Sequence, residues 1–118
     1  MPPNKHAVGM DGQNAAEVFL CERGYRILER NYRIKTGEID LIARDGTYTV
    51  FIEVKSRNGL RYGHPREAVN ALKQSRIIRT AQHYIMRKNL TDRDVRFDVI
   101  EVLNTQGSVH IEHIVNAF

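Results

Sequence analysis

Two short runs on either side of Asp45-Gly46 constrain the fold of this chain more than any other feature. The runs are Gly37–Ala43 and Val50–Lys55, and in both of them apolar residues alternate with polar or charged ones. Asp-Gly between alternating runs is typical of a β-hairpin, because both central residues of a type I′ turn need a positive φ. The sequence therefore predicts a hairpin in which Arg44 faces Thr47 across the turn.

The predicted register brings three carboxylates and a lysine to one face of this hairpin. Counting back from the turn pairs Ile42 with Thr49, Asp40 with Phe51, and Glu38 with Glu53. Because side chains alternate between the faces of a strand, one face receives Glu38, Asp40, Ile42, Thr49, Phe51, Glu53 and Lys55, and the other receives Ile39, Leu41, Ala43, Val50, Ile52 and Val54. Like charges opposed on a sheet destabilise it unless something neutralises them. A divalent cation is the candidate partner.

A charged hairpin face is typical of solvated surface as well as of a functional site, and alone it favours neither interpretation. The spacing favours a site, since Mg²⁺ needs only one or two carboxylates together with waters and substrate phosphates. Asp40 and Glu53 are the candidate metal ligands. Lys55 lies two residues beyond Glu53, where an ammonium group can act on a metal-bound water or on charge at phosphorus. Glu38 is either a third acidic member of the site or a solvent-exposed strand end, and we favour the first.

Length and composition indicate one soluble globular domain. The chain has 118 residues, of which 42% are hydrophobic and 27% charged, and this length suits a single core. Its net charge of +4 favours polyanionic partners such as nucleic acid. The one cysteine, Cys21, is expected to pack in the core, and it excludes an internal disulfide. No apolar stretch is long enough to span a membrane or to form a signal peptide, so a cytoplasmic protein is expected.

The order of the predicted elements is α-β-β-β-α-β-β. Residues 1–11 lack periodicity and are expected to form a flexible N-terminal tail, which leaves residues 12–118 as the folded domain. The expected elements are a helix over 13–23, a strand over 25–33, the two hairpin strands, a helix opening at Pro65, and strands over 95–102 and 109–115. The apolar stripe of the second helix comprises Val69, Leu72, Ile77, Ile78, Ala81, Tyr84 and Ile85. This order predicts an α/β domain with one mixed central sheet flanked by helices.

Five basic residues are candidates for contacts with nucleic acid. Arg57 and Arg61 follow the hairpin, and guanidinium groups match phosphate oxygens bidentately. Lys73, Arg76 and Arg79 recur on neighbouring turns of the second helix, a spacing that suits a nucleic-acid backbone. Ordinary solvated surface is the alternative for both groups.

Segments along nearly the whole chain resemble the YraN family of small bacterial proteins. They are Gly24–Leu28, Asn31–Arg33, Gly37–Ala43, Phe51–Arg57, Glu67–Val69, Arg96–Val99 and Ile111–Ile114. That family resembles a branch of the restriction-endonuclease-like PD-(D/E)XK superfamily, with a pattern close to that of archaeal Holliday-junction resolvases. In this resemblance Asp40 stands at the motif aspartate, and Glu53-Val54-Lys55 stands at the (D/E)XK tripeptide.

The resemblance implies a single restriction-endonuclease-like domain and an endonuclease that acts on DNA, branched DNA included, with Mg²⁺ or Mn²⁺. In that role Asp40 and Glu53 would hold the metal, Lys55 would position or activate the attacking water, and Glu38 and Gln13 would support the site. Resolvase-like relatives act as dimers, so a homodimer is also implied.

One departure from the family pattern concerns the first helix, where relatives carry Gly-Glu and this chain carries Gly12-Gln13. A glutamine keeps an oxygen that can coordinate a cation, but it lacks the negative charge that attracts one. Weaker metal binding is therefore expected. The departure favours an alternative function, a nucleic-acid-binding module that has the nuclease fold with little or no catalysis.

Overall fold

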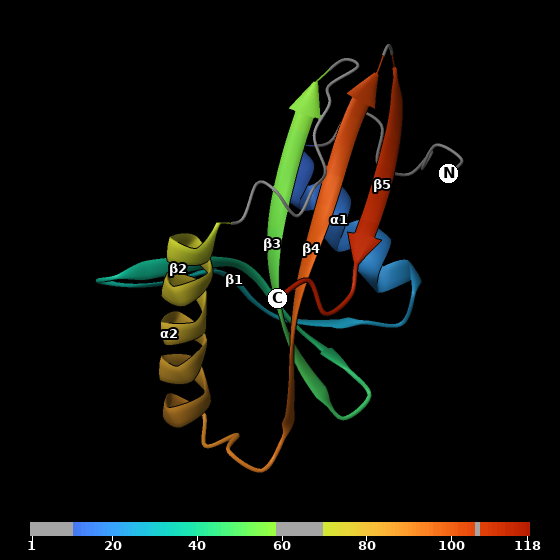
Figure 1. Ribbon diagram of the computed structural model, residues 1–118. Helices are drawn as coiled ribbons and strands as arrows, with labels where there is room; N and C mark the ends of the chain where they lie inside the picture. The colour runs from blue at the N-terminus through green and yellow to red at the C-terminus, as the bar shows by residue number, and fades with distance from the viewer. Residues whose placement is uncertain (1–10, 59–69, 106) are drawn as a thin grey trace.

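A computed structural model describes residues 11–58, 70–105 and 107–118, which form one α/β domain (Figure 1). Within these residues the elements are α1 (Gly12–Glu22), β1 (Arg26–Ile34), β2 (Gly37–Asp45), β3 (Tyr48–Asn58), α2 (Ala71–Arg87), β4 (Asp94–Thr105) and β5 (Ser108–Ile114). The strands form one sheet in the order β1-β2-β3-β4-β5. The β3–β4 pair is parallel and the other neighbouring pairs are antiparallel. The predicted α/β class, element order and mixed sheet are confirmed.

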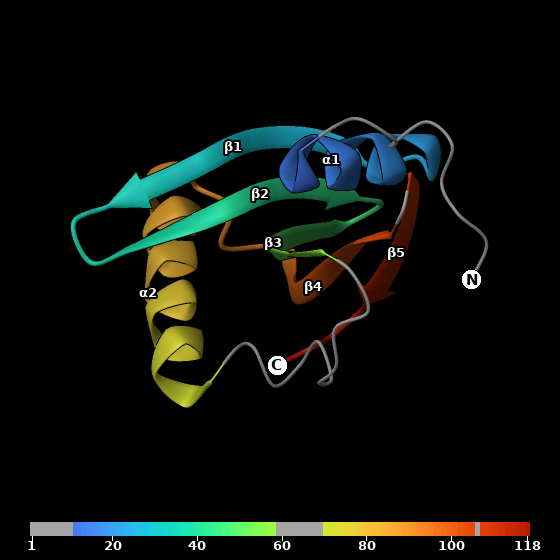
Figure 2. The same ribbon diagram turned by 90° about the horizontal axis from the view of Figure 1, so that it is seen from above.

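The sheet carries a hydrophobic cluster on each face, and one helix covers each cluster. In Figure 2, α1 and α2 lie on opposite sides of the β1–β2 ribbon and toward opposite ends of it. The α1 cluster includes Ala15, Ala16, Phe19, Leu20, Leu41, Ala43, Val50 and Ile52. The α2 cluster includes Tyr32, Ile39, Ile42, Phe51, Ile77, Ala81 and Tyr84. The strand alternation therefore predicted the faces of Ile42 and Phe51, and of Leu41, Ala43, Val50 and Ile52, correctly.

Three expected core residues are exposed. Cys21 lies at the surface of α1, because the buried stripe ends at Leu20 and the next residue is rotated by about 100°. Leu72 is 61% exposed and Ile78 is 37% exposed on α2, which presents a single narrow face to the sheet. The predicted helix start at Pro65 lies outside the described residues, as do residues 1–10 of the tail predicted over 1–11, whereas Asp11 is the N-cap of α1.

The β2–β3 turn differs by one position from the prediction. Asp45 pairs with Tyr48, so the two loop residues are Gly46 and Thr47. Only Gly46 has a positive φ, 58°, as a type II′ turn requires at its first central position. Asp45 remains in the strand, where its Oδ2 accepts a hydrogen bond from Nη1 of Arg96 at 3.0 Å.

The predicted register is consequently wrong by two residues. Arg44 pairs with Thr49 and Ile42 with Phe51, whereas the prediction opposed Arg44 to Thr47 and Asp40 to Phe51. A shift of two residues leaves every side chain on its original face. The error therefore changes the neighbours of each residue without changing its face.

A kink in the β1–β2 ribbon gives Ile39 a different face from the one predicted. Two residues from Leu41, Ile39 should share its face, yet it packs in the α2 cluster. Its β1 partner Tyr32 packs there too. Opposite this point Asn31 has a φ of 53° inside β1, and the β1–β2 register also shifts between Ile27 and Glu29. This local rotation falls at Asp40, the residue between Ile39 and Leu41.

Candidate active site

The candidate site begins where β2 separates from β3. The paired residues of these strands extend from Asp45 and Tyr48 to Leu41 and Ile52. At the next position, the backbone of Asp40 is not paired with β3. Its Oδ2 accepts a hydrogen bond of 2.8 Å from the backbone N–H of Val54. The kinked strand therefore holds the Asp40 carboxylate against β3.

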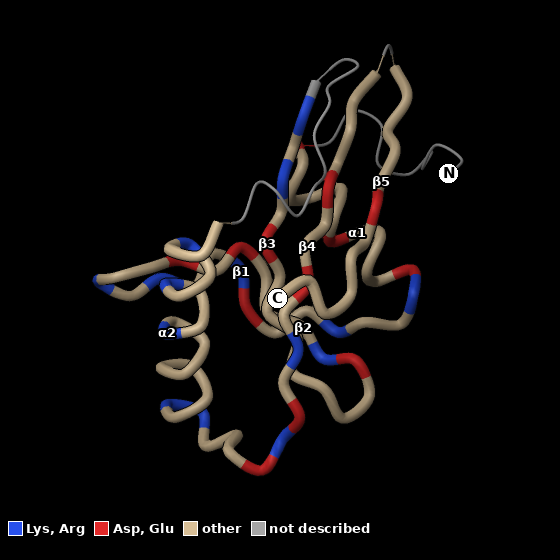
Figure 3. The backbone as a smooth tube through the Cα atoms, viewed as in Figure 1, with Lys and Arg blue, Asp and Glu red and all other residues tan. Residues whose placement is uncertain are grey.

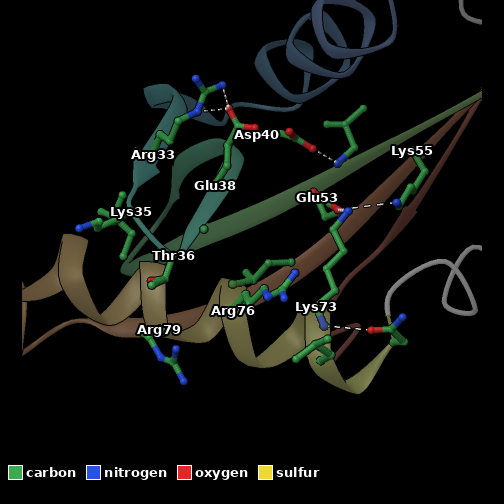
Figure 4. Close-up of a pocket in the computed structure, with 16 residues that line it drawn as sticks. Arg33, Lys35, Thr36, Glu38, Asp40, Glu53, Lys55, Lys73, Arg76 and Arg79 are labelled. Carbon is green, nitrogen blue, oxygen red and sulfur yellow. Dashed lines mark hydrogen bonds and ion pairs between the residues drawn. The ribbon is translucent and has the colours of Figure 1, made fainter.

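Asp40, Glu53 and Lys55 line one pocket of about 1030 Å³, between the β1–β2 turn, β3 and α2 (Figure 4). The charged residues described in its lining are Arg33, Lys35, Lys55, Lys73, Arg76 and Arg79 against Glu38, Asp40 and Glu53. The pocket thus has two carboxylates close to β3 and an excess of positive charge around them. Such a lining suits a polyanion that approaches an acidic centre.

Glu53 is the most buried of the three carboxylates, with 6% of its side chain exposed. Its Oε2 forms an ion pair with Nζ of Lys73 and lies 3.7 Å from Nζ of Lys55. The two lysines come from different elements, Lys55 from β3 and Lys73 from α2. A buried carboxylate requires such partners, since an unpaired buried charge is costly.

A glycine allows α2 to come close enough to complete the pocket. A Cβ on Gly37 would lie 2.4 Å from Oγ1 of Thr80 and 3.1 Å from the carbonyl oxygen of Arg76. The Asn70 side chain caps α2 by accepting a hydrogen bond of 2.9 Å from the backbone N–H of Lys73. The helix therefore starts beside β3 and passes over the start of β2, which places its first turn over Glu53.

Glu38 lies at the edge of this pocket, and its predicted opposition to Glu53 is wrong. Its cross-strand partner is Arg33 of β1, whose Nε donates a hydrogen bond of 3.1 Å to Oε2 of Glu38. Glu38 is 37% exposed in its side chain. The Glu38 carboxylate lines the pocket, and the Arg33 guanidinium offsets its negative charge.

Three other predicted site residues are not brought into the pocket. Gln13 is in the first turn of α1, where a Cβ on the preceding Gly12 would lie 1.5 Å from Oγ of Ser56. Ser56 points to the face opposite Lys55, so α1 begins on the other side of β3. Arg57 pairs with Glu101, with 2.9 Å between Nε and Oε2. Arg61 lies outside the described residues.

Sequence reasoning missed two basic residues and the position of a third. Arg33 lines the pocket from the end of β1, and Lys35 lines it from the β1–β2 turn. Their position shortly before Gly37, where the strand that carries Asp40 begins, could have indicated that they lie near the site. Lys73 was predicted as one member of a phosphate-binding stripe, and the structure places its amine on Glu53. Arg76 and Arg79 line the pocket as exposed side chains.

The surroundings shift the protonation of the acidic centre. Burial and the adjoining Glu53 carboxylate raise the pKa of Asp40 from 3.8 to about 7, although the Val54 N–H opposes the rise. Burial and the neighbouring Lys73 ammonium lower the pKa of Lys55. For Lys73, burial acts to lower the pKa, but the contact with Glu53 raises it overall. The rise in the pKa of Asp40 therefore comes first from burial and second from the adjoining Glu53 carboxylate.

We expect Asp40→Asn to become progressively more stable, relative to the metal-free wild-type protein, as pH rises from about 4 to about 7. The folded carboxyl binds its proton up to about pH 7, whereas the unfolded one releases it near 3.8. Its stabilisation is therefore complete below the unfolded pKa and lost as pH rises through the folded pKa. Melting temperatures of both proteins in EDTA across this range measure the effect. A constant difference between the two proteins would contradict it.

The two carboxylates fit the protein's share of a magnesium or manganese site. Among residues 11–58, 70–105 and 107–118, no group of three or more His, Cys, Asp or Glu side chains forms a complete cation site. Mg²⁺ does not need one, since it retains waters and binds substrate oxygens. The adjoining side chains of Asp40 and Glu53 are the observation that supports the fit, because a cation bound by both carboxylates would offset their mutual repulsion.

Comparison with known proteins identifies the family. The model of the uncharacterised protein family UPF0102 matches residues 12–102. The chain belongs to the UPF0102 family. A UPF0102 protein of Acetivibrio thermocellus is 52% identical over 110 residues, covering 92% of this chain and 85% of the relative. Another from Symbiobacterium thermophilum is 50% identical over 112 residues, with 94% and 95% covered. These matches confirm the resemblance to the YraN family, which is the same family.

The family match includes the whole candidate site. Residues 12–102 contain the β1–β2 ribbon, β3 and α2, and hence every described residue that lines the pocket. A UPF0102 protein of Clostridioides difficile is 44% identical over 115 residues, with 98% of this chain and 99% of the relative covered. Neither of the helices described in this UPF0102 protein has the length and apolar character needed to span a membrane.

Proposed function

We propose that this UPF0102 protein is a metal-dependent endonuclease that hydrolyses phosphodiester bonds in DNA. The observation that carries the proposal is the convergence of Asp40, Glu53 and Lys55 in one pocket rimmed by lysine and arginine side chains. Two carboxylates on adjoining strands provide oxygen ligands for a hard cation. The ammonium of Lys55 lies beside them.

Hydrolysis requires a water oxygen to attack phosphorus while one ester P–O bond breaks and the leaving oxygen takes up a proton. A bound Mg²⁺ or Mn²⁺ supplies a water of lowered pKa and polarises the phosphodiester. Asp40 and Glu53 would hold this cation. Lys55 would orient the attacking water and offset negative charge on the phosphate oxygens, and burial, which lowers its pKa, suits an amine that exchanges protons with water.

The positive side chains around the pocket support a nucleic-acid substrate. In Figure 3, lysine and arginine positions recur on α2 and along β3. Of these, Lys55 of β3 and three residues of α2 line the pocket, namely Lys73, Arg76 and Arg79. Lys35 adds positive charge from the β1–β2 turn, and Arg33 of β1 lies beside it in an ion pair with Glu38. Contacts between such groups and phosphates release counterions, so DNA affinity is expected to fall steeply as salt rises.

Reversing two charges at Arg76 and Arg79 should weaken DNA binding at least about tenfold at moderate salt. Both side chains are exposed and line the pocket, so the double variant Arg76→Glu/Arg79→Glu loses phosphate contacts with little cost to folding. Fluorescence anisotropy with a labelled oligonucleotide in EDTA measures the change. The matched control is Arg87→Glu/Lys88→Glu at the other end of α2, outside the pocket. If the two double variants bound DNA with equal affinity, Arg76 and Arg79 would be ordinary surface residues.

A DNA-binding module without catalysis is the second candidate function. Two observations favour it. Lys73 already neutralises Glu53, and Gln13, which replaces the glutamate of resolvase-like relatives, is not among the residues that line the pocket. Such a module would retain the positive rim and bind DNA in the absence of any divalent cation.

Incubation of the full chain with duplex, single-stranded and four-way-junction DNA separates the two functions. Each substrate is tested with Mg²⁺, with Mn²⁺ and with EDTA. The endonuclease proposal expects internal cleavage with a cation and none in EDTA. Binding of the same DNA without cleavage under any of these conditions would overturn it in favour of the binding module.

A further inference from the structure

The contact between Lys73 and Glu53 joins an accessible cation to a buried anion. The Lys73 side chain is 43% exposed, whereas that of Glu53 is 6% exposed. The ammonium meets Oε2 of Glu53, the same oxygen that lies 3.7 Å from Lys55. In Figure 4 the Lys73 side chain extends from α2 across the pocket toward Glu53 and Lys55. Lys73 therefore holds one of the two Glu53 oxygens that are available to a metal ion.

A divalent cation and the Lys73 ammonium cannot both bind Oε2 closely. A hard cation binds carboxylate oxygens directly, at about 2.0–2.1 Å for Mg²⁺, and it repels a neighbouring ammonium group. Without the cation, a negative charge as buried as that of Glu53 needs a partner. A cation on Oε2 therefore requires Lys73 to move away from this oxygen.

We propose that Lys73 is an exchangeable counter-ion, which holds Glu53 in the metal-free protein and moves to a substrate phosphate when a divalent cation takes that oxygen. The inference rests on the proposed function, because it assigns to the same pocket both a cation and a polyanion. It makes Lys73 a positioning residue of the site in addition to its expected phosphate contact.

The position of Lys73 suits this exchange better than that of Lys55. Lys73 lies in the first turn of α2, whose start is held by the Asn70 cap. Its flexible stem can change rotamer without movement of the helix. Arg76, one turn further along, is exposed in the same pocket, so a displaced Lys73 ammonium lies close to another phosphate-binding group. Lys55 is only 25% exposed on β3.

The exchange couples the binding of metal and DNA. A phosphate that attracts Lys73 frees Glu53 for the cation, and a cation on Glu53 frees Lys73 for the phosphate. Coupling between two ligands is reciprocal, so each must increase the affinity for the other by the same factor.

Calorimetric titration with Mn²⁺ alone tests the first half of the exchange. Lys73→Met, which removes the competing ammonium, is expected to bind Mn²⁺ about tenfold more tightly than the wild-type protein. Lys73→Arg keeps a positive charge at Glu53 and should bind as the wild type does. Arg76→Met is the matched control, since it removes one positive charge from the same pocket one turn away. A gain in Lys73→Met no larger than that in Arg76→Met would overturn the proposal.

A measurement on the wild-type protein tests the displacement without a variant. Lysine acetylation, followed by mass spectrometry with and without Mn²⁺, reports how accessible the Lys73 amine is. Acetylation of Lys73 should rise several-fold with saturating Mn²⁺, while that of the distant Lys88 stays constant. Unchanged reactivity of Lys73 in the Mn²⁺-bound protein would overturn the exchange.

These experiments separate the inference from the proposed function. Equal Mn²⁺ affinities in all variants, together with DNA cleavage, would overturn the role of Lys73 and leave the endonuclease intact. Tighter binding in Lys73→Met without DNA cleavage would support the exchange and overturn the catalytic function. Absence of Mn²⁺ binding from every protein would overturn both.

Discussion

Replacing Asp40 with asparagine is expected to lower the rate of cation-dependent DNA cleavage about a thousandfold, since metal assistance contributes several kcal/mol to such reactions. In the wild type, Asp40 accepts a hydrogen bond of 2.8 Å from the Val54 N–H. The amide oxygen of asparagine can accept the same hydrogen bond, so the junction of β2 and β3 should survive. What is lost is the negative charge that, in the proposed function, would hold the cation. Single-turnover cleavage rates at saturating Mg²⁺ measure the effect.

The control for this variant is Glu38→Gln, the same carboxylate-to-amide change in the same pocket. Glu38 pairs with Arg33 and is more exposed than Glu53, so we expect a loss of about tenfold, at the lower end of the range for an outer contact of a metal site. If Asp40→Asn retained as much activity as Glu38→Gln, Asp40 would not be a metal ligand. A folded but inactive Asp40→Asn protein with normal DNA affinity would agree with its assigned role.

Replacing Asp98 with alanine is expected to destabilise the protein by about 3–5 kcal/mol, the usual cost of breaking a buried ion pair. Asp98 is fully buried. It accepts hydrogen bonds from Nε of Arg96 at 3.0 Å and from the backbone N–H of Asn116 at 3.1 Å, and its Oδ2 lies 2.7 Å from Nε2 of His113. Its removal leaves Arg96, 7% exposed, without its main partner. Urea unfolding followed by circular dichroism measures the loss.

An exposed ion pair provides the comparison for Asp98→Ala. Arg33 is 71% exposed and pairs with Glu38 at the surface, so Arg33→Ala should cost less than about 1 kcal/mol. Burial acts to raise the pKa of Asp98, but the hydrogen bonds from His113 and Arg96 hold it below its usual value. The stability that Asp98 provides is therefore present above the unfolded pKa and lost as pH falls through the folded pKa. Equal losses in the two variants would show that the Asp98 network contributes little.

Part of the candidate site follows from local sequence. Glu53 and Lys55 share a face because side chains alternate along one strand, and no distant contact alters that periodicity. The same periodicity placed Ile42 and Phe51 on the α2 face. It survived an error of two residues in the register, because a slip of an even number of residues preserves the face.

The exact turn required information beyond the local pattern. Asp45-Gly46 and Gly46-Thr47 are both plausible two-residue loops. The structure has the second, in which Asp45 remains in β2 and binds Arg96 of β4. That partner lies 51 positions along the chain, so no pattern around the turn indicates it.

By itself, the sequence determined the α/β class, the order of the elements, the mixed sheet and the strand faces around Glu53, because these depend on local periodicity and on chain order. Only the tertiary structure decided how Asp40 and Lys73 meet that strand. Asp40 lies where β2 changes faces between Leu41 and Ile39, and Lys73 is placed by the contact of α2 with Gly37. Both depend on packing between segments far apart in the chain, where the geometry of one element sets the position of another.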